Sequence, residues 1–219
     1  MFSFVDVSQA VEAGNAGLVE SEVKKALSEG LEASHVLEKG LIAGMITVGE
    51  RFRAGDMYLP EVLMSSKAMH KGLEIVRPLL AQSDRKLQQK VIMGTVEGDV
   101  HDIGKNIVGT LIEGNGFNLI DLGVDVRPEV FVKAIEEYEP DILGMSAMLT
   151  TTMTKMKMVI DSLKEKGLRE KVKVVIGGAP VNEEFAASIG ADGYAPDGGV
   201  AAELIRKLVA PVSSLGTID

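Results

Sequence analysis

The stretch VIMGTVEGDVHDIGK (residues 91–105) decides the fold of the second half of the chain, because two structural periods meet in it. Residues 91–96 are an apolar run of strand length, and polar residues and a glycine end the run. From Ile103 onward, apolar residues recur at helical spacing through Ile107, Leu111 and Ile112. The stretch therefore predicts a buried strand, a loop and a helix, in that order.

The same unit recurs along the rest of the chain. Short apolar runs follow at residues 119–122, 142–146 and 172–176, with a weaker one at 192–195. Helical patterns cover residues 128–138, 153–163 and 200–208. Alternating strands and helices predict an α/β fold with a doubly wound, Rossmann-type, five-stranded parallel sheet. Five strands favour the flavodoxin-like strand order over the six-stranded dinucleotide-binding order.

Upstream of residue 81 the pattern is helical throughout. Apolar residues recur at helical spacing over 3–13, 19–31 and 37–52, the last with Ser34 as its expected N-cap, and a further helix opens at Pro60. Short connections between these helices predict an antiparallel helical bundle. A polar stretch at 81–90 separates the two patterns, so we expect a helical domain over 1–86 and a sheet domain over 87–219.

The composition excludes several classes of function. Lys and Arg number 23 against 32 Asp and Glu, and this acidic balance of −9 disfavours nucleic acid and anionic membranes as partners. No apolar run approaches the roughly 20 residues that span a bilayer, and the N-terminus lacks the pattern of a secretory signal. We therefore expect a cytoplasmic protein. Cysteine is absent, which rules out zinc–thiolate sites and thiol catalysis, and leaves imidazole chemistry to His35, His70 and His101.

Polar and glycine residues gather where each predicted strand ends. The five junctions are residues 97–105, 123–127, 146–152, 177–181 and 194–197. Ligands of open parallel sheets bind beyond the carboxyl ends of the strands. We therefore expect the binding site on this edge.

The first junction places Asp99 two residues before His101, so both side chains point to one side of an extended segment. A carboxylate beside an imidazole fixes the ring tautomer, which is typical of metal-ligating histidines. Gly104 then lets a bulky group approach the backbone. Two other interpretations stay open: a helix N-cap at Asp99 or Asp102 beside an exposed histidine, and a general-base pair.

The fourth junction, Gly177–Gly178, predicts either a turn that needs positive φ or a floor for a large ligand. The Gly-x-Gly-x-x-Gly and Walker patterns of nucleotide sites are absent from the sequence, as is the Gly-x-Ser-x-Gly nucleophile elbow. A nucleotide site and an acyl-transfer site are therefore disfavoured.

Together, three of these junctions resemble a known signature. Asp99-Val-His101-Asp-Ile-Gly104, Ser146-x-Met148 and Gly177-Gly178 match the cobalamin-binding pattern Asp-x-His-x-x-Gly, Ser-x-Leu, Gly-Gly, with Met148 in place of leucine. Upstream, residues 48–52 and 57–61 are similar to the helical cap of methionine synthase and of the small corrinoid proteins of methyltransferase systems. The resemblance covers about residues 5 to 210.

The resemblance implies a role for each residue. His101 is expected to be the lower axial ligand of the cobalt, with Asp99 and then Thr152 extending the hydrogen-bonded relay behind it. The helical domain is expected to cap the corrin. The residues expected to bind the cofactor are Gly98, Asp99, Val100, His101, Asp102, Ile103, Gly104, Ile107, Ser146, Met148, Leu149, Thr150, Thr152, Gly177, Gly178, Ala179, Tyr194, Ala195 and Pro196 in the sheet domain, and Met57, Leu59, Val62 and Leu63 in the cap.

The function implied is that of a methyl carrier, a subunit of a corrinoid-dependent methyltransferase system with no catalytic side chain of its own. Its expected partners are a substrate-specific methyltransferase, an acceptor methyltransferase that uses a thiol or tetrahydrofolate, and a reductive activator. Two alternatives are a corrinoid-dependent sensor, which needs a DNA-binding segment that this sequence does not offer, and the small subunit of an adenosylcobalamin-dependent isomerase, which normally lacks the helical front half. A flavodoxin-like domain without corrinoid requires all three motif parts to be accidental.

Overall fold

The computed structural model describes residues 3–80 and 89–209, and its contacts group the chain into two compact units. Unit 1 comprises Met1–Gln89, Ile103–Ile120 and Asp197–Gly199, and unit 2 comprises Lys90–Asp102, Asp121–Pro196 and Val200–Asp219. The predicted division at residue 86 keeps 103–120 with the sheet, whereas the contacts group them with the helices. Most of the polar stretch that suggested the division, 81–90, lies outside the described residues, and the domain boundary stays a prediction.

Unit 1 contains the predicted N-terminal helices. The first two are α1 (Phe4–Glu12) and α2 (Ala16–Ser28). A continuous helical segment follows, made of α3 (Ala33–His35), η1 (Val36–Ile42) and α4 (Ala43–Ala54). The last is α5 (Leu59–Val76), which continues into the short η2 (Arg77–Leu79). α6 (Ile103–Gly114) packs against α5 in the same unit. The expectation of a Ser34 cap is wrong: the helix already begins at Ala33, with Glu32 at the capping position and no side-chain cap bond.

One segment of unit 1 departs from the α-helix that its spacing predicts, because η1 is a π-helix. Two glycines of this helical segment face α1 closely. A Cβ on Gly40 would lie 2.9 Å from a methyl of Val7, and one on Gly44 would lie 2.7 Å from the carbonyl oxygen of Ser8. The approach of α1 therefore depends on glycine at both positions.

The sheet has the order β2-β1-β3-β4-β5, the flavodoxin-like order that the sequence predicts. Its strands are β1 (Lys90–Thr95), β2 (Asn118–Asp121), β3 (Ile142–Ser146), β4 (Lys173–Gly177) and β5 (Gly193–Tyr194). β1, β3, β4 and β5 run parallel, and β3 is buried along residues 142–145, as expected of a central strand covered on both faces.

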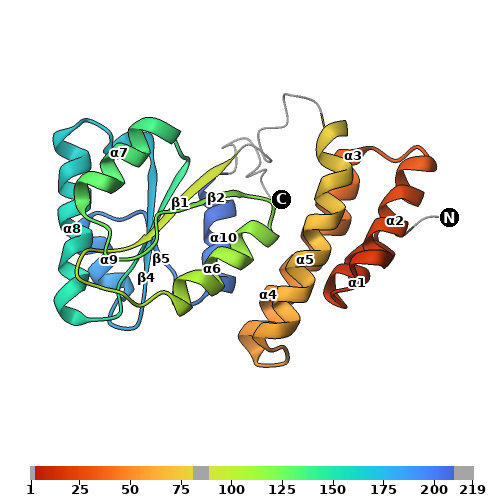
Figure 1. Cartoon of the computed structure of the whole chain (residues 1–219), viewed down its shortest axis with the longest axis horizontal. Coiled ribbons are helices and arrows are strands. Elements are labelled where there is room, and N and C mark those ends of the chain that lie inside the picture. The colour runs from red at the N-terminus through yellow and green to blue at the C-terminus, as the bar shows by residue number, and fades with distance from the viewer. Residues whose placement is uncertain (1–2, 81–88, 210–219) are drawn as a thin grey trace, which may run out of the picture. The chain divides into compact units, whose positions relative to one another are not determined.

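The helices that follow these strands are α7 (Pro128–Tyr138), α8 (Thr150–Glu165), the short η4 (Arg169–Lys171), α9 (Glu183–Ile189) and α10 (Gly198–Val209). α7 and α8 lie side by side on one face of the sheet (Figure 1). α9 has no counterpart among the helices that the sequence predicts. Its seven residues are too few for a helical period to stand out, although Asn182 caps its first turn by accepting from the amide of Phe185 at 2.8 Å.

The register of the parallel strands aligns the residues that end them. Thr95 of β1 is paired with Ser146 of β3, and Ser146 is paired with Gly177 of β4. A one-residue shift would send these side chains to the other face of the sheet. The register therefore brings three of the predicted junctions together at the carboxyl edge.

Asp192 anchors the sheet near the start of β5. Its carboxylate accepts from the Val174 amide at 2.8 Å and from the Arg169 guanidinium at 2.6 Å, and Lys173 lies 3.3 Å away. Burial raises the pKa of Asp192, but these donors outweigh it and the pKa lies below its ordinary value. Since the ionised form is favoured in the folded state, Asp192 stabilises the fold above the ordinary carboxyl pKa of about 4, and this contribution is lost as the pH falls.

We expect Asp192→Asn to lower the free energy of unfolding at pH 7 by about 1.5–3 kcal/mol, the range for hydrogen bonds to charged groups. Urea unfolding followed by circular dichroism measures the difference. Below about pH 4 the wild-type carboxyl begins to protonate on unfolding, so the difference should narrow. A difference independent of pH between 7 and 3 would contradict this role.

Candidate functional site

The centre of the predicted site is the carboxylate of Asp99, which is fully buried. Its Oδ1 lies 2.7 Å from Nδ1 of His101 and accepts from the His101 amide at 3.1 Å. Its Oδ2 accepts from the Met148 amide and from the Thr152 hydroxyl, each at 2.7 Å. The loop after β1, the loop after β3 and the first turn of α8 therefore converge on one side chain.

These bonds keep Asp99 ionised. Burial raises its pKa, but the hydrogen bonds from the Met148 amide, the His101 ring, the Thr152 hydroxyl and the His101 amide outweigh burial and hold the pKa well below its ordinary value. An ionised carboxylate can only accept, so Nδ1 of His101 must carry the proton of the bond between them. The other ring nitrogen, Nε2, is then an acceptor in the neutral imidazole.

The His101 ring is about half exposed, at 52% of its side-chain surface. No described residue forms a hydrogen bond with Nε2 in this structure. A carboxylate that orients a histidine through one nitrogen and leaves the other free is the usual arrangement behind a metal ligand. A single imidazole is sufficient for a metal whose other ligands come from a macrocycle.

Thr95 also anchors the loop that carries His101, and the sequence did not predict this role. The hydroxyl of Thr95, buried at the end of β1, donates to the carbonyl of His101 at 2.9 Å. The sequence signal that could have indicated this anchor is a threonine at the end of an apolar strand. The Met148 amide gave no sequence signal, because every residue except proline has one.

The glycine pair has a structural reason of its own. Gly178 has φ +122, and a Cβ there would lie 1.8 Å from the carbonyl oxygen of Ala147. A Cβ on Gly177 would lie 2.8 Å from the carbonyl oxygen of Ala195. Both glycines therefore allow neighbouring loops to approach at the carboxyl edge. Gly104 differs, because nothing lies within 4 Å of a Cβ built there.

The surface around His101 suits a large, partly apolar ligand. Val100 is 70% exposed, Met148 40% and Leu149 43%, which is unusual for apolar side chains in adjacent loops. The hydroxyl of Ser146 has no hydrogen-bond partner among residues 3–80 and 89–209 and is free for a ligand. The free Nε2, this hydroxyl and the exposed apolar side chains fit a corrinoid, which offers a cobalt, amide groups and an apolar ring edge.

The other expected binding residues are distributed over both units. In unit 2, Asp102, Thr150, Ala179 and Pro196 are exposed at the strand ends, Gly98 is exposed with φ +80, Tyr194 is half-buried and Ala195 is buried. In unit 1, Ile103 is exposed and Ile107 half-buried on α6. Of the expected cap residues, Met57 and Val62 are core residues of unit 1, Leu59 is half-buried, and Leu63 is exposed. Tyr58, at the start of the same helix as Leu63, is also exposed, and the cap assignments stay predictions.

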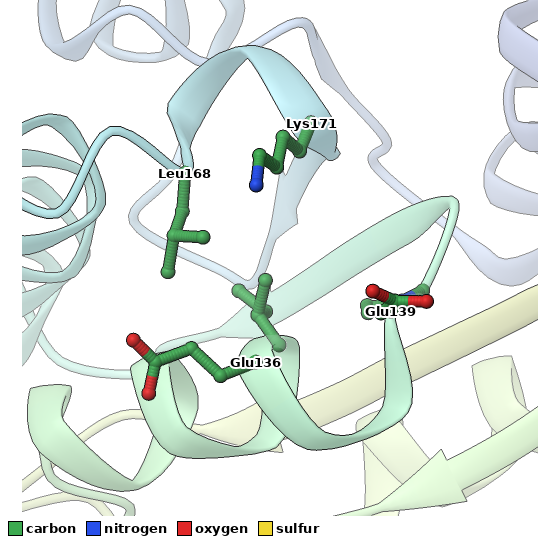
Figure 2. A pocket seen from close by; sticks show the side chains of 6 residues that line it. Glu136, Glu139, Leu168 and Lys171 are labelled. Carbon is green, nitrogen blue, oxygen red and sulfur yellow. The ribbon is translucent and has the colours of Figure 1, made fainter.

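A pocket of about 390 Å³ lies at the opposite edge of the sheet, next to residues that precede β3 and β4 (Figure 2). Glu136 and Glu139 line it together with Leu168 and Lys171. Both glutamates are exposed, and none of the predicted site residues belongs to this pocket. It is not part of the candidate site.

Two family models match the chain, each described as a B12 binding domain. One covers residues 89–205 and the other residues 5–77. A corrinoid protein of Desulfitobacterium hafniense is 42% identical over 207 residues, which are 93% of this chain and 96% of that protein. Dimethylamine corrinoid protein 1 of Methanosarcina acetivorans is 46% identical over 189 residues, 86% of this chain and 88% of that protein.

Solved structures agree with these sequence relatives. A cobalamin-binding protein from Desulfitobacterium hafniense has a TM-score of 0.81 and 31% identity, over 96% of this chain and 100% of that chain. The methanol:cobalamin methyltransferase complex MtaBC from Methanosarcina barkeri contains a chain with a TM-score of 0.77 and 32% identity, over 99% of this chain and 81% of that chain. The chain belongs to the family of corrinoid proteins built from B12 binding domains.

Proposed function

We propose that this protein carries a methyl group on the cobalt of a bound corrinoid, between a substrate-specific methyltransferase and a second methyltransferase that passes it to a thiol or to tetrahydrofolate. The observation that carries the proposal is His101, held by the buried Asp99 through Nδ1 with Nε2 free and the ring half exposed. When bound, the corrinoid supplies a cobalt centre that accepts a methyl group in its reduced form and gives it to a nucleophile.

The chain's own residues would hold and tune that group. His101 would ligate the cobalt through Nε2, and the Asp99–Thr152 pair would keep its ring in one tautomer and one orientation. Ser146 would contact the base of the cofactor's nucleotide tail, and the edge formed by Gly177 and Gly178 would accommodate the rest of that tail. Val100, Met148 and Leu149 would contact the apolar edge of the ring.

The relatives support a methyltransferase as a partner. They are named for dimethylamine and trimethylamine, and one matched structure is a complex with a methanol-specific methyltransferase. Since relatives of similar fold serve different donors, we propose that donor choice lies in the partner methyltransferase. We also propose that a reductive activator, which restores cobalt to the reactive state, is a partner. The proposed location is the cytoplasm. No helix within the described part of the chain is long and apolar enough to cross a membrane.

The alternatives are less well supported. A corrinoid-dependent regulator and an isomerase subunit would both bind the cofactor through the same signature. The relatives named corrinoid proteins match this chain over its helical half as well as its sheet, up to 96% of their own length. We therefore favour the methyl carrier.

We expect His101→Ala to leave the fold and much of the corrinoid binding intact, because one axial ligand is a small part of a large contact surface. The visible spectrum of the corrinoid-loaded protein should lose the absorbance of cobalt with histidine bound, called the histidine-on signature. Methyl transfer in the reconstituted system should slow. His35→Ala is the control, since this exposed imidazole of the helical half lies outside the proposed site. A spectrum unchanged by His101→Ala would contradict the axial-ligand assignment.

Two glycine variants should separate a folding role from a binding role. Gly178→Ala should destabilise the corrinoid-free protein by at least about 2 kcal/mol, because its Cβ would meet backbone at a positive φ. Gly104→Ala should change the free energy of unfolding by less than about 1 kcal/mol, because alanine is favoured in a helix and its Cβ has open space here. The same variant should weaken corrinoid binding, because the added methyl group would crowd the cofactor. Urea unfolding and corrinoid titration measure the two effects. Wild-type affinity in Gly104→Ala would refute the assigned role of this glycine.

A further inference from the structure

Asp125, in the loop between β2 and α7, has an unusual backbone. Its φ of 53° lies in the left-handed region, and among the described non-glycine residues only Glu139, with φ 46°, shares this property. Left-handed backbone strains residues other than glycine and persists where the surroundings enforce it. The contacts of Asp125 show what enforces it.

Asp125 holds the loop after β1 by two hydrogen bonds. Its Oδ1 accepts from the amide of Gly98 at 2.7 Å, and its own amide donates to the carbonyl of Asp99 at 2.9 Å. The carboxylate and the backbone amide of Asp125 thus form hydrogen bonds with two adjacent residues of one loop. Gly98 has φ 80°, a backbone conformation that glycine adopts without strain.

The segment that bears Asp125 is fixed to the sheet. Val126 donates to the carbonyl of Thr95 at 3.0 Å and forms a parallel bridge with Val96. Asp125 is therefore anchored at the end of β1, immediately before the loop that it holds.

Asp99 is consequently held from two sides. Thr152 and the Met148 amide hold its carboxylate, and Asp125 holds its carbonyl. Because Asp99 Oδ1 sets the direction of the His101 ring, a displaced Asp99 backbone would also displace His101. Glu97, paired with Lys155 at 2.8 Å, ties the start of the same loop to α8.

We infer that Asp125 is a positioning residue, which acts through the backbone of Gly98 and Asp99 to fix where His101 presents Nε2. The inference rests on the proposed role of His101 as the lower cobalt ligand. In this role Asp125 acts through the loop and not by contact with the ligand. It keeps the loop in the binding geometry before the corrinoid arrives, so that less ordering is needed on binding.

Three variants isolate the carboxylate from the backbone. Asp125→Gly keeps the left-handed conformation and removes the acceptor, whereas Asp125→Asn keeps an acceptor oxygen and tolerates the same φ. Glu139→Gly is the matched control, because it makes the same backbone change at the other left-handed position. Glu139 ends α7 and lines the pocket at the opposite edge (Figure 2).

Two readouts test the inference. In the corrinoid-free full-length protein, Asp125→Gly should speed amide hydrogen exchange of Gly98 by about tenfold, the factor for one lost hydrogen bond, as measured by NMR. In the corrinoid-loaded protein, the histidine-on fraction in the visible spectrum should fall severalfold. Asp125→Asn should lie between wild type and Asp125→Gly in both readouts, because a neutral acceptor forms a weaker hydrogen bond than a carboxylate does. Glu139→Gly should match wild type in both readouts. A single cooperative thermal transition shows that Asp125→Gly is folded.

Asp125→Gly values that match those of Glu139→Gly in both readouts would overturn the inference. So would Asp125→Asn values as poor as those of Asp125→Gly, since the oxygen acceptor would then not be the cause. A wild-type protein without a histidine-on spectrum would refute the proposed ligand role instead, and Gly98 exchange would still decide whether Asp125 holds the loop.

Discussion

The buried carboxylate of Asp99 is the constraint on which the rest of the site depends. A carboxylate removed from water costs several kcal/mol unless donors surround it. Here the donors come from Met148, Thr152 and His101, which belong to three different segments of the chain. The strand register that aligns Thr95, Ser146 and Gly177 is what brings those segments to one edge. The fold and the site therefore stabilise each other.

This arrangement prepares His101 before any cofactor is present. With Nδ1 committed to Asp99, the free Nε2 is the only ring nitrogen that can bind a metal. A ligand that is already oriented needs little reorganisation on binding, which improves affinity and fixes geometry. The proposed carrier would need such a fixed ligand, because the cobalt would have to stay accessible to two partner enzymes in turn.

Much of the fold could be predicted from the sequence, because local periodicity and the rules of parallel sheets leave few topologies. The resemblance to the cobalamin-binding family predicted that Asp99, His101 and Thr152 form one hydrogen-bonded relay. Other features depend on tertiary contacts that no local pattern records. The π-helical turn packs Gly40 against Val7, and Gly178 serves the approach of a neighbouring carbonyl. An apolar helix start likewise cannot tell a core residue such as Met57 from a ligand-facing one.

The tautomer of His101 in the corrinoid-free protein tests the central claim most directly. Two-bond ¹H–¹⁵N NMR of histidine-labelled protein at about pH 8, above the ordinary pKa of histidine, reads the protonation of both ring nitrogens. The account predicts a protonated Nδ1 and an unprotonated Nε2 for His101, lost in Asp99→Asn. A His101 ring protonated on Nε2, or the same tautomer in both proteins, would contradict it.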